Sequence, residues 1–193
     1  MGFFTPAGAF FAHDFSQKKE IHMKQIVLRY GLLSGIIGAT LMFAMTLYLN
    51  NDVARFANSE YAGMTGIILS LIVVYFGIRA YRDQQGPGAF SFFQGFQVGL
   101  FISLISSAIY VAAWMIVYHT MMPDFMDKMI EYSLTKMKSA GASSAEIESS
   151  MAEMAHYKEL YKNPLFIAAF TFIEPFPVGL VITLVSAALL RRA

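Results

Sequence analysis

Residues 165–190, LFIAAFTFIEPFPVGLVITLVSAALL, form a long apolar run with a single charged side chain, Glu174. At a rise of about 1.5 Å per residue, a helix of this length exceeds the roughly 30 Å of bilayer hydrocarbon. Further apolar runs over about 26–49, 62–81 and 96–118 are also long enough to cross. None has the charged stripe of a helix that packs on a soluble core. The sequence therefore predicts an all-α membrane protein with four transmembrane helices.

The composition agrees with this fold class. Of the 193 residues, 56% are hydrophobic and 14% are charged, whereas about a quarter are charged in a typical soluble domain. The net charge of +1 provides no basic field for nucleic acid. The chain has no cysteine, which excludes disulfides, thiolate zinc sites and cysteine nucleophiles.

The basic residues predict the orientation, because they concentrate beside cytoplasmic helix ends in membrane proteins. If the protein lies in a bacterial inner membrane with both termini in the cytoplasm, most of the basic residues near the spans fall on the cytoplasmic side. The opposite side receives the connection at 52–60, with Arg55 alone, and the loop at 119–163, with five Lys against seven Asp and Glu. Trp114 and Tyr118 would then belong to an outer aromatic belt. The inner residues are Lys18, Lys19, Lys24, Arg29, Arg79, Arg82, Arg191 and Arg192.

The segments outside the spans divide the chain further. Residues 1–22 are expected to be a mobile cytoplasmic tail, or to precede a true start at Met23, and residues 23–192 form the membrane domain. Within it, residues 121–162 predict an extracytoplasmic helical hairpin. Pro123 is expected as the first helical residue, and Ser143 with Glu146 forms a capping box after a glycine-containing break.

The cytoplasmic connection between the second and third spans contains a turn and a group of aromatic side chains. Gly86-Pro87-Gly88 predicts the turn. Phe90, Phe92, Phe93 and Phe96 follow it, and we expect their rings at the headgroup level. A short re-entrant or gating element is the alternative.

Glu174 is the candidate intramembrane functional residue. It lies nine residues beyond Leu165, about 14 Å along the helix from its outer end. A carboxylate at this depth is costly, so it usually faces the protein interior and is partnered or protonated. Pro175 and Pro177 lack backbone donors and should interrupt the helix beside it. This pattern fits a structural acid in a kinked bundle and also fits a proton or ion path.

Two further sets of residues can be placed by their depth and spacing. Equal-depth counting brings four polar side chains to the level of Glu174 as possible partners, namely Thr40, Ser70, Ser107 and Tyr110. Small residues at four-residue intervals predict close helix packing within the bundle or, as the alternative, homodimerisation. They are Gly31, Gly35 and Ala39 in the first span, and Gly95, Gly99, Ser103 and Ser107 in the third.

No catalytic, cofactor or metal motif is found in the sequence. His119 and His156 with the methionines of the outer loop could suggest copper, but methionines that fill gaps between two helices explain them better. There is no nucleophile elbow and no glycine-rich phosphate loop. We therefore expect no cofactor, no metal site and no enzymatic activity.

Four segments together are similar to a known family. They are the stretch from Met23 to Gly31, GIRAYRD at 77–83, FSFFQGFQVGL at 90–100 and the segment from Tyr161 to Arg192. The chain resembles the bacterial membrane-protein family catalogued as domain of unknown function 4199 over residues 23–192. Pro175 departs from the hydrophobic residue usual in that family. The resemblance implies a small multi-pass membrane protein and assigns no activity, cofactor or site residue.

Two functions remain open at this stage. The first is a structural or accessory membrane protein that binds a membrane-protein partner or forms a homo-oligomer through its outer hairpin or its small-residue faces. The second is a small proton- or ion-linked transporter or channel that uses Glu174. The sequence identifies no substrate, ligand or oligomeric state.

Overall fold

The four predicted spans are helical in the computed structural model, which describes residues 6–49, 59–85 and 90–192, with side chains described from residue 21 onward except at 59 and 60. The first three spans lie in α1 (Pro6–Leu49), α2 (Ser59–Gln84) and α3 (Phe92–Thr120), and the fourth is divided between α6 (Pro164–Ile173) and α7 (Pro175–Leu190). Four stretches are long and apolar enough to cross a membrane: Ile21–Leu49, Tyr61–Gln84, Phe92–Thr120 and Pro164–Leu190. Among the described residues, β-pairing is limited to one isolated bridge between Phe90 and Arg192. The all-helical prediction with four such spans is confirmed.

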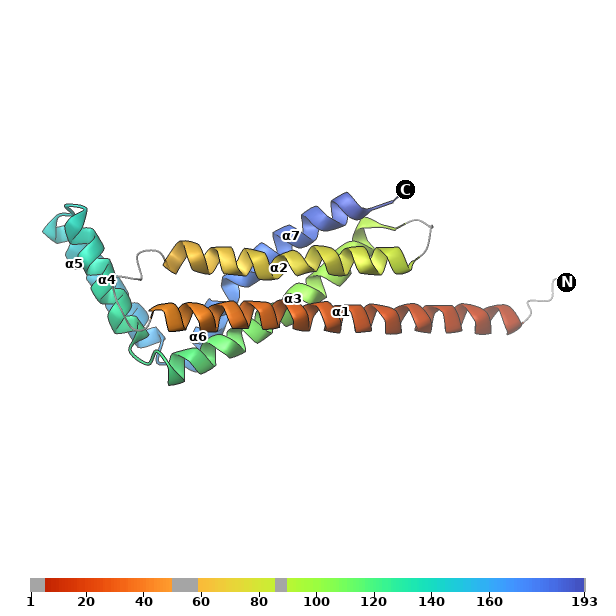
Figure 1. Ribbon diagram of the computed structural model, residues 1–193, viewed down its shortest axis with the longest axis horizontal. Coiled ribbons are helices and arrows are strands. Elements are labelled where there is room, and N and C mark those ends of the chain that lie inside the picture. Colours follow the sequence, from red (N-terminus) through yellow and green to blue (C-terminus); the bar gives the residue numbers. More distant parts are fainter. Residues whose placement is uncertain (1–5, 50–58, 86–89, 193) are drawn as a thin grey trace.

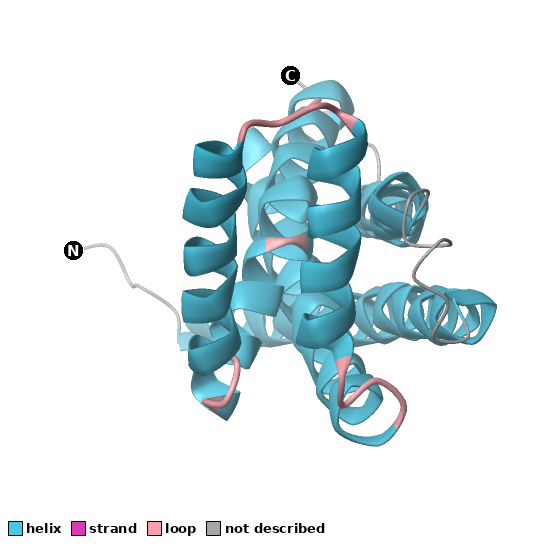
Figure 2. Cartoon of the chain, turned by 90° about the vertical axis from the view of Figure 1, so that its left-hand side faces the viewer, coloured by secondary structure: helices cyan, strands magenta, loops and turns pink. Residues whose placement is uncertain are grey.

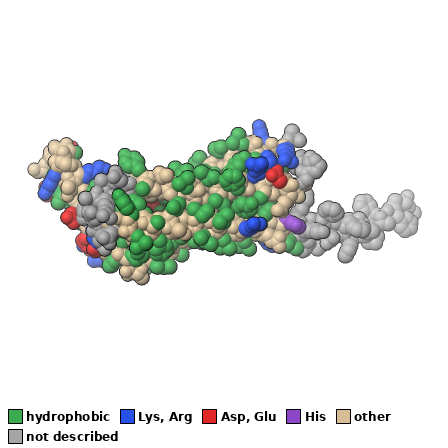
Figure 3. Space-filling view, in the orientation of Figure 1, with side chains coloured by type: hydrophobic (Ala, Val, Ile, Leu, Met, Phe, Trp, Pro, Cys, Tyr) green, Lys and Arg blue, Asp and Glu red, His purple; other side chains and the backbone are tan. Residues whose placement is uncertain are grey.

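The surface of the bundle carries large apolar side chains that water would not tolerate in such numbers. Leu165 is 80% exposed, Leu189 is 72% exposed and Leu47 is 66% exposed. In the space-filling view, hydrophobic side chains cover the middle of the visible face, while charged side chains gather toward its two ends (Figure 3). This distribution is that of a membrane-embedded protein.

The helices pack as a bundle in which α1 contacts α2 and α3, and α7 contacts α2 and α3. The beginning of α1 and the end of α7 lie at the same end of the molecule (Figure 1). Glycines allow α1 and α3 to approach closely. A Cβ atom at Gly35 would lie 2.7 Å from the Cβ of Ile109, and one at Gly31 would lie 2.9 Å from the Cβ of Ile105.

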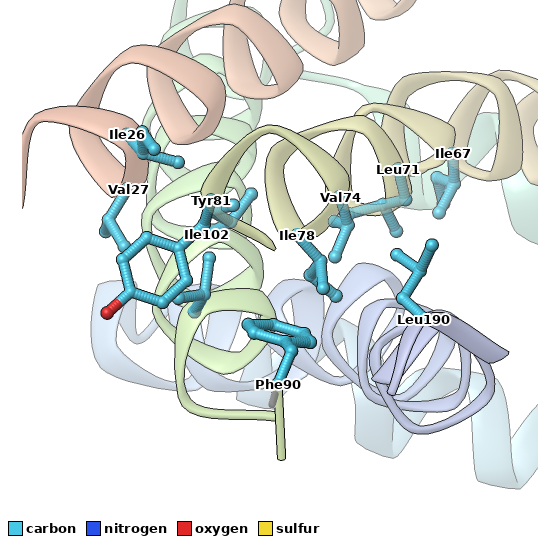
Figure 4. Packing of buried hydrophobic residues seen from close by; sticks show 11 residues of the cluster. Ile26, Val27, Ile67, Leu71, Val74, Ile78, Tyr81, Phe90, Ile102 and Leu190 are labelled. Atoms are coloured by element: carbon cyan, nitrogen blue, oxygen red, sulfur yellow. The ribbon is translucent and has the colours of Figure 1, made fainter. Parts of the chain in front are cut away.

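A cluster of buried side chains from α1, α2, α3 and α7 joins the helices, and α2 contributes more of it than any other helix (Figure 4). Phe90, just before α3, is 1% exposed in this cluster, and its ring centroid lies 6.2 Å from that of Tyr81. Its backbone N–H donates to the carbonyl of Arg192 at 3.3 Å, and the Arg192 N–H donates back at 2.9 Å. The expected headgroup position is therefore wrong for Phe90, because this pairing directs its ring into the core. Phe93 is 62% exposed.

Two further helices, α4 (Phe125–Ser139) and α5 (Ser144–Leu160), pack against each other beyond the end of α3. They lie side by side in front of the bundle when it is seen from that end (Figure 2). The predicted capping box at Ser143 and Glu146 is present. The prediction for Pro123 is wrong: the amides of Met121 and Met122 both donate to Val117 and close α3, so Pro123 falls in the turn before α4.

Parts of the sequence-based division cannot be compared with the structure. Gly86-Pro87-Gly88 and Arg55 lie outside the described residues. The helix α1 runs without interruption from Pro6 through residues 22 and 23. The boundary of the membrane domain at residue 23 stays a prediction.

Adding one methyl group at Gly35 should destabilise the bundle. Because the Cβ of Ile109 is fixed to its backbone, α3 would have to move away from α1, at a cost of about 2 kcal/mol for overpacking. We expect Gly35→Ala to lower the midpoint of thermal unfolding in detergent micelles.

Gly63→Ala provides the matched control, because nothing lies within 4 Å of a Cβ atom there. Replacing a helical glycine in open space should stabilise by about 0.5–1 kcal/mol. Equal midpoints for the two variants would contradict the close packing of α1 on α3.

Candidate functional site

Glu174 stands at the interruption between α6 and α7. Its backbone N–H donates to the carbonyl of Thr171 at 3.3 Å, one residue short of the α-helical spacing. The next residue, Pro175, begins α7 without a backbone donor, and Pro177 also lacks one. The helix is thus interrupted where the two prolines predict. Carbonyl groups of the preceding turn lose their helical partners there.

The carboxylate of Glu174 borders a cavity of about 180 Å³ between the helices. The residue is exposed rather than sealed in a dry core. The residues that line the cavity come from α1, α2, α3 and α6. Met122, Phe125 and Tyr161, at the two ends of the α4–α5 pair, complete the lining. The cavity therefore lies toward the end of the bundle that α4 and α5 occupy.

Tyr110 is the predicted partner that shares a site with Glu174. The two side chains are close enough to interact electrostatically, and both residues line the cavity. Neither Thr40 nor Ser70 is among the residues that line it. The Thr40 hydroxyl donates to the carbonyl of Ile36 at 2.8 Å, and the Ser70 hydroxyl donates to that of Ile67 at 2.8 Å. Both bonds stay within their own helices, which is a common alternative for hydroxyls in a helix.

Ser107, the fourth predicted partner, is fully buried, and its hydroxyl has no hydrogen-bond partner in the described part of the chain. One turn farther toward the start of α3, the hydroxyls of Ser103 and Thr183 lie 3.3 Å apart. Such a contact requires close helices: a Cβ at Gly99 would lie 2.6 Å from Thr183, and one at Gly95 would lie 3.2 Å from Ala187. The small-residue face of α3 thus packs against α7 within the chain.

A second polar contact crosses the bundle on the other side of α3. The hydroxyl of Ser34 lies 2.9 Å from that of Ser106 and donates to the carbonyl of Ser70 at 2.8 Å. The sequence analysis did not identify Ser34, Ser106 or Thr183. Serine and threonine in an apolar span are the available signal, but the sequence does not say which of them face another helix.

Aromatic residues line the cavity together with Glu174. The ring centroids of Trp114 and Phe125 lie 4.9 Å apart at 82°, and those of Phe125 and Tyr161 lie 6.5 Å apart. Burial, with smaller effects from the charge of Glu174 and from Tyr118, raises the pKa of Tyr161 to about 12. Its hydroxyl therefore stays neutral at physiological pH.

Trp114 has contacts that the sequence did not predict, while its place in an outer aromatic belt stays a prediction. It is partly buried against the α4–α5 pair and lines the cavity. Phe125 and Tyr161 were also missed as site residues. They belong to segments far apart in the sequence, and only the docking of the α4–α5 pair on the bundle brings them together.

The charge balance of the cavity is one-sided. Glu174 is its only charged lining residue, because no Lys, Arg, His or Asp is among the described residues that form it. The described part of the chain has no group of three or more His, Cys, Asp or Glu suited to a metal ion. His119 and His156 are both exposed, and the His119 ring contacts the carbonyl of Met115 in its own helix. The cavity therefore presents a carboxylate without a basic partner among the described residues, a neighbouring phenol and further aromatic rings.

Comparison with known proteins identifies a family but no activity. The family model described as "Protein of unknown function (DUF4199)" matches residues 29–192, which is most of the chain. No curated protein and no solved structure matches this chain.

The contact between Tyr110 and Glu174 can be measured by a double-mutant cycle. Tyr110→Phe and Glu174→Gln should each change the free energy of unfolding. Their effects should not add, because each variant removes one partner of the expected interaction between the phenol and the carboxylate. We expect a coupling energy of about 1 kcal/mol from unfolding in mixed micelles.

Tyr75→Phe supplies the control for the loss of a phenol, since Tyr75 is also partly buried on a span. Combined with Glu174→Gln, it should be additive within about 0.5 kcal/mol. Additive effects for Tyr110 as well would contradict the contact.

Proposed function

The chain belongs to the DUF4199 family of unknown function, and we propose that it is a small proton-linked carrier of a bacterial inner membrane in which Glu174 takes up and releases the proton. The observation that carries this proposal is the position of Glu174 on a cavity between the helices, with no basic side chain among the described residues that line it. We propose that the protein binds and moves its ligand without chemical conversion.

Electrostatics explains why such a carboxylate favours transport. A charged group within a membrane span is costly unless another charge or a proton neutralises it. Among the described residues lining the cavity, none supplies a positive charge. A proton would relieve this cost, and an incoming cation would compete with the proton for the same carboxylate. Proton transport requires only that the carboxylate take up a proton from one side of the membrane and release it to the other.

Buried hydroxyls provide a polar route from Glu174 toward the opposite end of the bundle. Ser107 lies one turn of α3 before Tyr110, and Ser103 lies one turn before Ser107. Thr183 of α7 contacts Ser103. The Ser107 hydroxyl has no hydrogen-bond partner among the described residues, so it keeps its capacity to bond a water molecule. These hydroxyls support access to the carboxylate from the inner side.

The alternative accessory function has less support in the geometry. The glycine faces of α1 and α3 are occupied by Ile105, Ile109 and Thr183 of the same chain. The α4–α5 pair has no large hydrophobic side chain among the exposed ones, so it offers no apolar docking face among the described residues. Binding of a protein partner or formation of a homo-oligomer remains the alternative proposal, and we assign no surface of the molecule to it.

We propose the orientation in which both termini are cytoplasmic and the α4–α5 pair forms an extracytoplasmic helical hairpin. Arg79, Arg82, Arg191 and Arg192 support it, because all lie toward the end of the molecule where α1 begins and α7 ends. The cavity would then open toward the outer side of the membrane.

This orientation can be tested by thiol labelling, since the chain has no cysteine of its own. A cysteine at exposed Ala140 should react with a membrane-impermeant maleimide in intact spheroplasts. A cysteine at exposed Gln25 should react only after the membrane is permeabilised. The reverse pattern would overturn the proposed orientation.

Proton transport through Glu174 can be measured in liposomes that contain the purified protein and a trapped pH-sensitive dye. When a potassium diffusion potential drives protons inward, the wild type should acidify the lumen faster than empty vesicles. Glu174→Gln should reduce the rate to that of empty vesicles, because an amide cannot take up the proton.

Glu148→Gln is the matched control, since Glu148 is exposed on α5 far from any span. It should retain the wild-type rate. A Glu174→Gln rate equal to the wild type, or a wild-type rate equal to that of empty vesicles, would show that Glu174 is a structural acid.

A further inference from the structure

The cavity at Glu174 combines a carboxylate with four aromatic residues. Tyr110, Trp114, Phe125 and Tyr161 all line it, and Glu174 supplies its single negative charge. Aromatic faces attract cations through their quadrupoles, and cages of such rings bind quaternary ammonium groups. This attraction grows stronger when the bound cation is removed from water.

From this combination we propose that the cavity binds a small organic cation with alkyl groups on its nitrogen, such as a trimethylammonium compound, with Glu174 as its counter-charge. This inference rests on the proposed carrier function, because it names the substrate that exchanges with the proton at Glu174. The rings would contact the alkyl groups while the carboxylate faces the positive centre.

The size of the cavity fits such a group. Its volume is about 180 Å³, and a protein cavity of about 150 Å³ accommodates a benzene molecule. A tetramethylammonium ion has a bulk similar to benzene. A drug-sized ligand needs a cavity of roughly 300 Å³ or more. The volume of the cavity therefore favours a small cation over a drug-sized ligand.

The lining disfavours hard metal cations. Such ions take six or more oxygen ligands at short distance, whereas most of this lining is aromatic, aliphatic or thioether. Met42, Met45 and Met122 contribute polarisable sulfur atoms, which suit alkyl groups better than a hydrated ion. The Thr46 hydroxyl already donates to the carbonyl of Met42 at 2.9 Å. An alkylated ammonium ion needs no such oxygen ligands.

The chain contains its own reporter for this site, because Trp114 is its only tryptophan and lines the cavity. Choline added to the purified wild type in nanodiscs should change the tryptophan emission in a saturable manner. The uncharged carbon analogue of choline, in which a tert-butyl group replaces trimethylammonium, should bind more weakly by about tenfold or more. Equal affinities, or no saturable change with choline, would overturn the proposal.

Variants separate the contributions of the charge and of the rings. Glu174→Gln should weaken choline binding by about tenfold or more, and Phe125→Leu should weaken it by roughly three- to tenfold while leaving an apolar side chain in place. Phe101→Leu is the control, because Phe101 is 44% exposed on a span and does not line the cavity. A Phe125→Leu variant that elutes as a monodisperse peak and binds choline as the wild type does would contradict the role of the ring.

The same preparations distinguish failure of this inference from failure of the carrier function. Loss of proton flux in Glu174→Gln without any effect of choline on Trp114 would overturn the organic cation and retain the carrier. Saturable, charge-dependent choline binding without Glu174-dependent proton flux would retain the binding site and overturn proton-linked transport.

Discussion

Every backbone N–H and C=O group in hydrocarbon needs a partner within the protein, and this requirement shapes all four spans. The helices α1, α2 and α3 satisfy it without interruption across the membrane. The fourth span cannot, because Pro175 and Pro177 lack the donor. Its helix ends at Ile173 and resumes at Pro175, with Glu174 between them. The acid thus stands where the backbone itself is least satisfied and where an open, polar environment is most useful.

The sequence predicted those features that depend on one helix at a time. Hydropathy located the four spans, and the prolines located the interruption at Glu174. Counting of depth placed Tyr110 near Glu174, because the rise per residue is the same in every helix. The same counting could not exclude Thr40, whose hydroxyl bonds within its own helix. The depth of a residue in the membrane does not depend on how its helix is rotated about its own axis. That rotation is determined by packing against the neighbouring helices.

Features that depend on several elements were beyond the sequence. Phe90 was expected at the headgroups, yet it is buried because its backbone pairs with Arg192 at the far end of the chain. Phe125 and Tyr161 join the cavity only because the α4–α5 pair docks on the end of the bundle. Trp114 was assigned to an aromatic belt since nothing in the sequence showed that these rings would gather around it.

The origin of the cavity walls bears on how a carrier of this kind would work. Glu174 and Tyr110 belong to membrane spans, whereas Phe125 and Tyr161 belong to the segments that begin and end the α4–α5 pair. A movement of that pair relative to α3 and α6 would change the ring contacts while Tyr110 and Glu174 stay on their spans. Neutralising the carboxylate by a proton removes its attraction for a cation, and separating the rings removes the rest of the binding energy. The affinity for the cation would therefore depend on the protonation of Glu174, and such a dependence of one ligand on the other is what coupling between a proton and a second ligand requires.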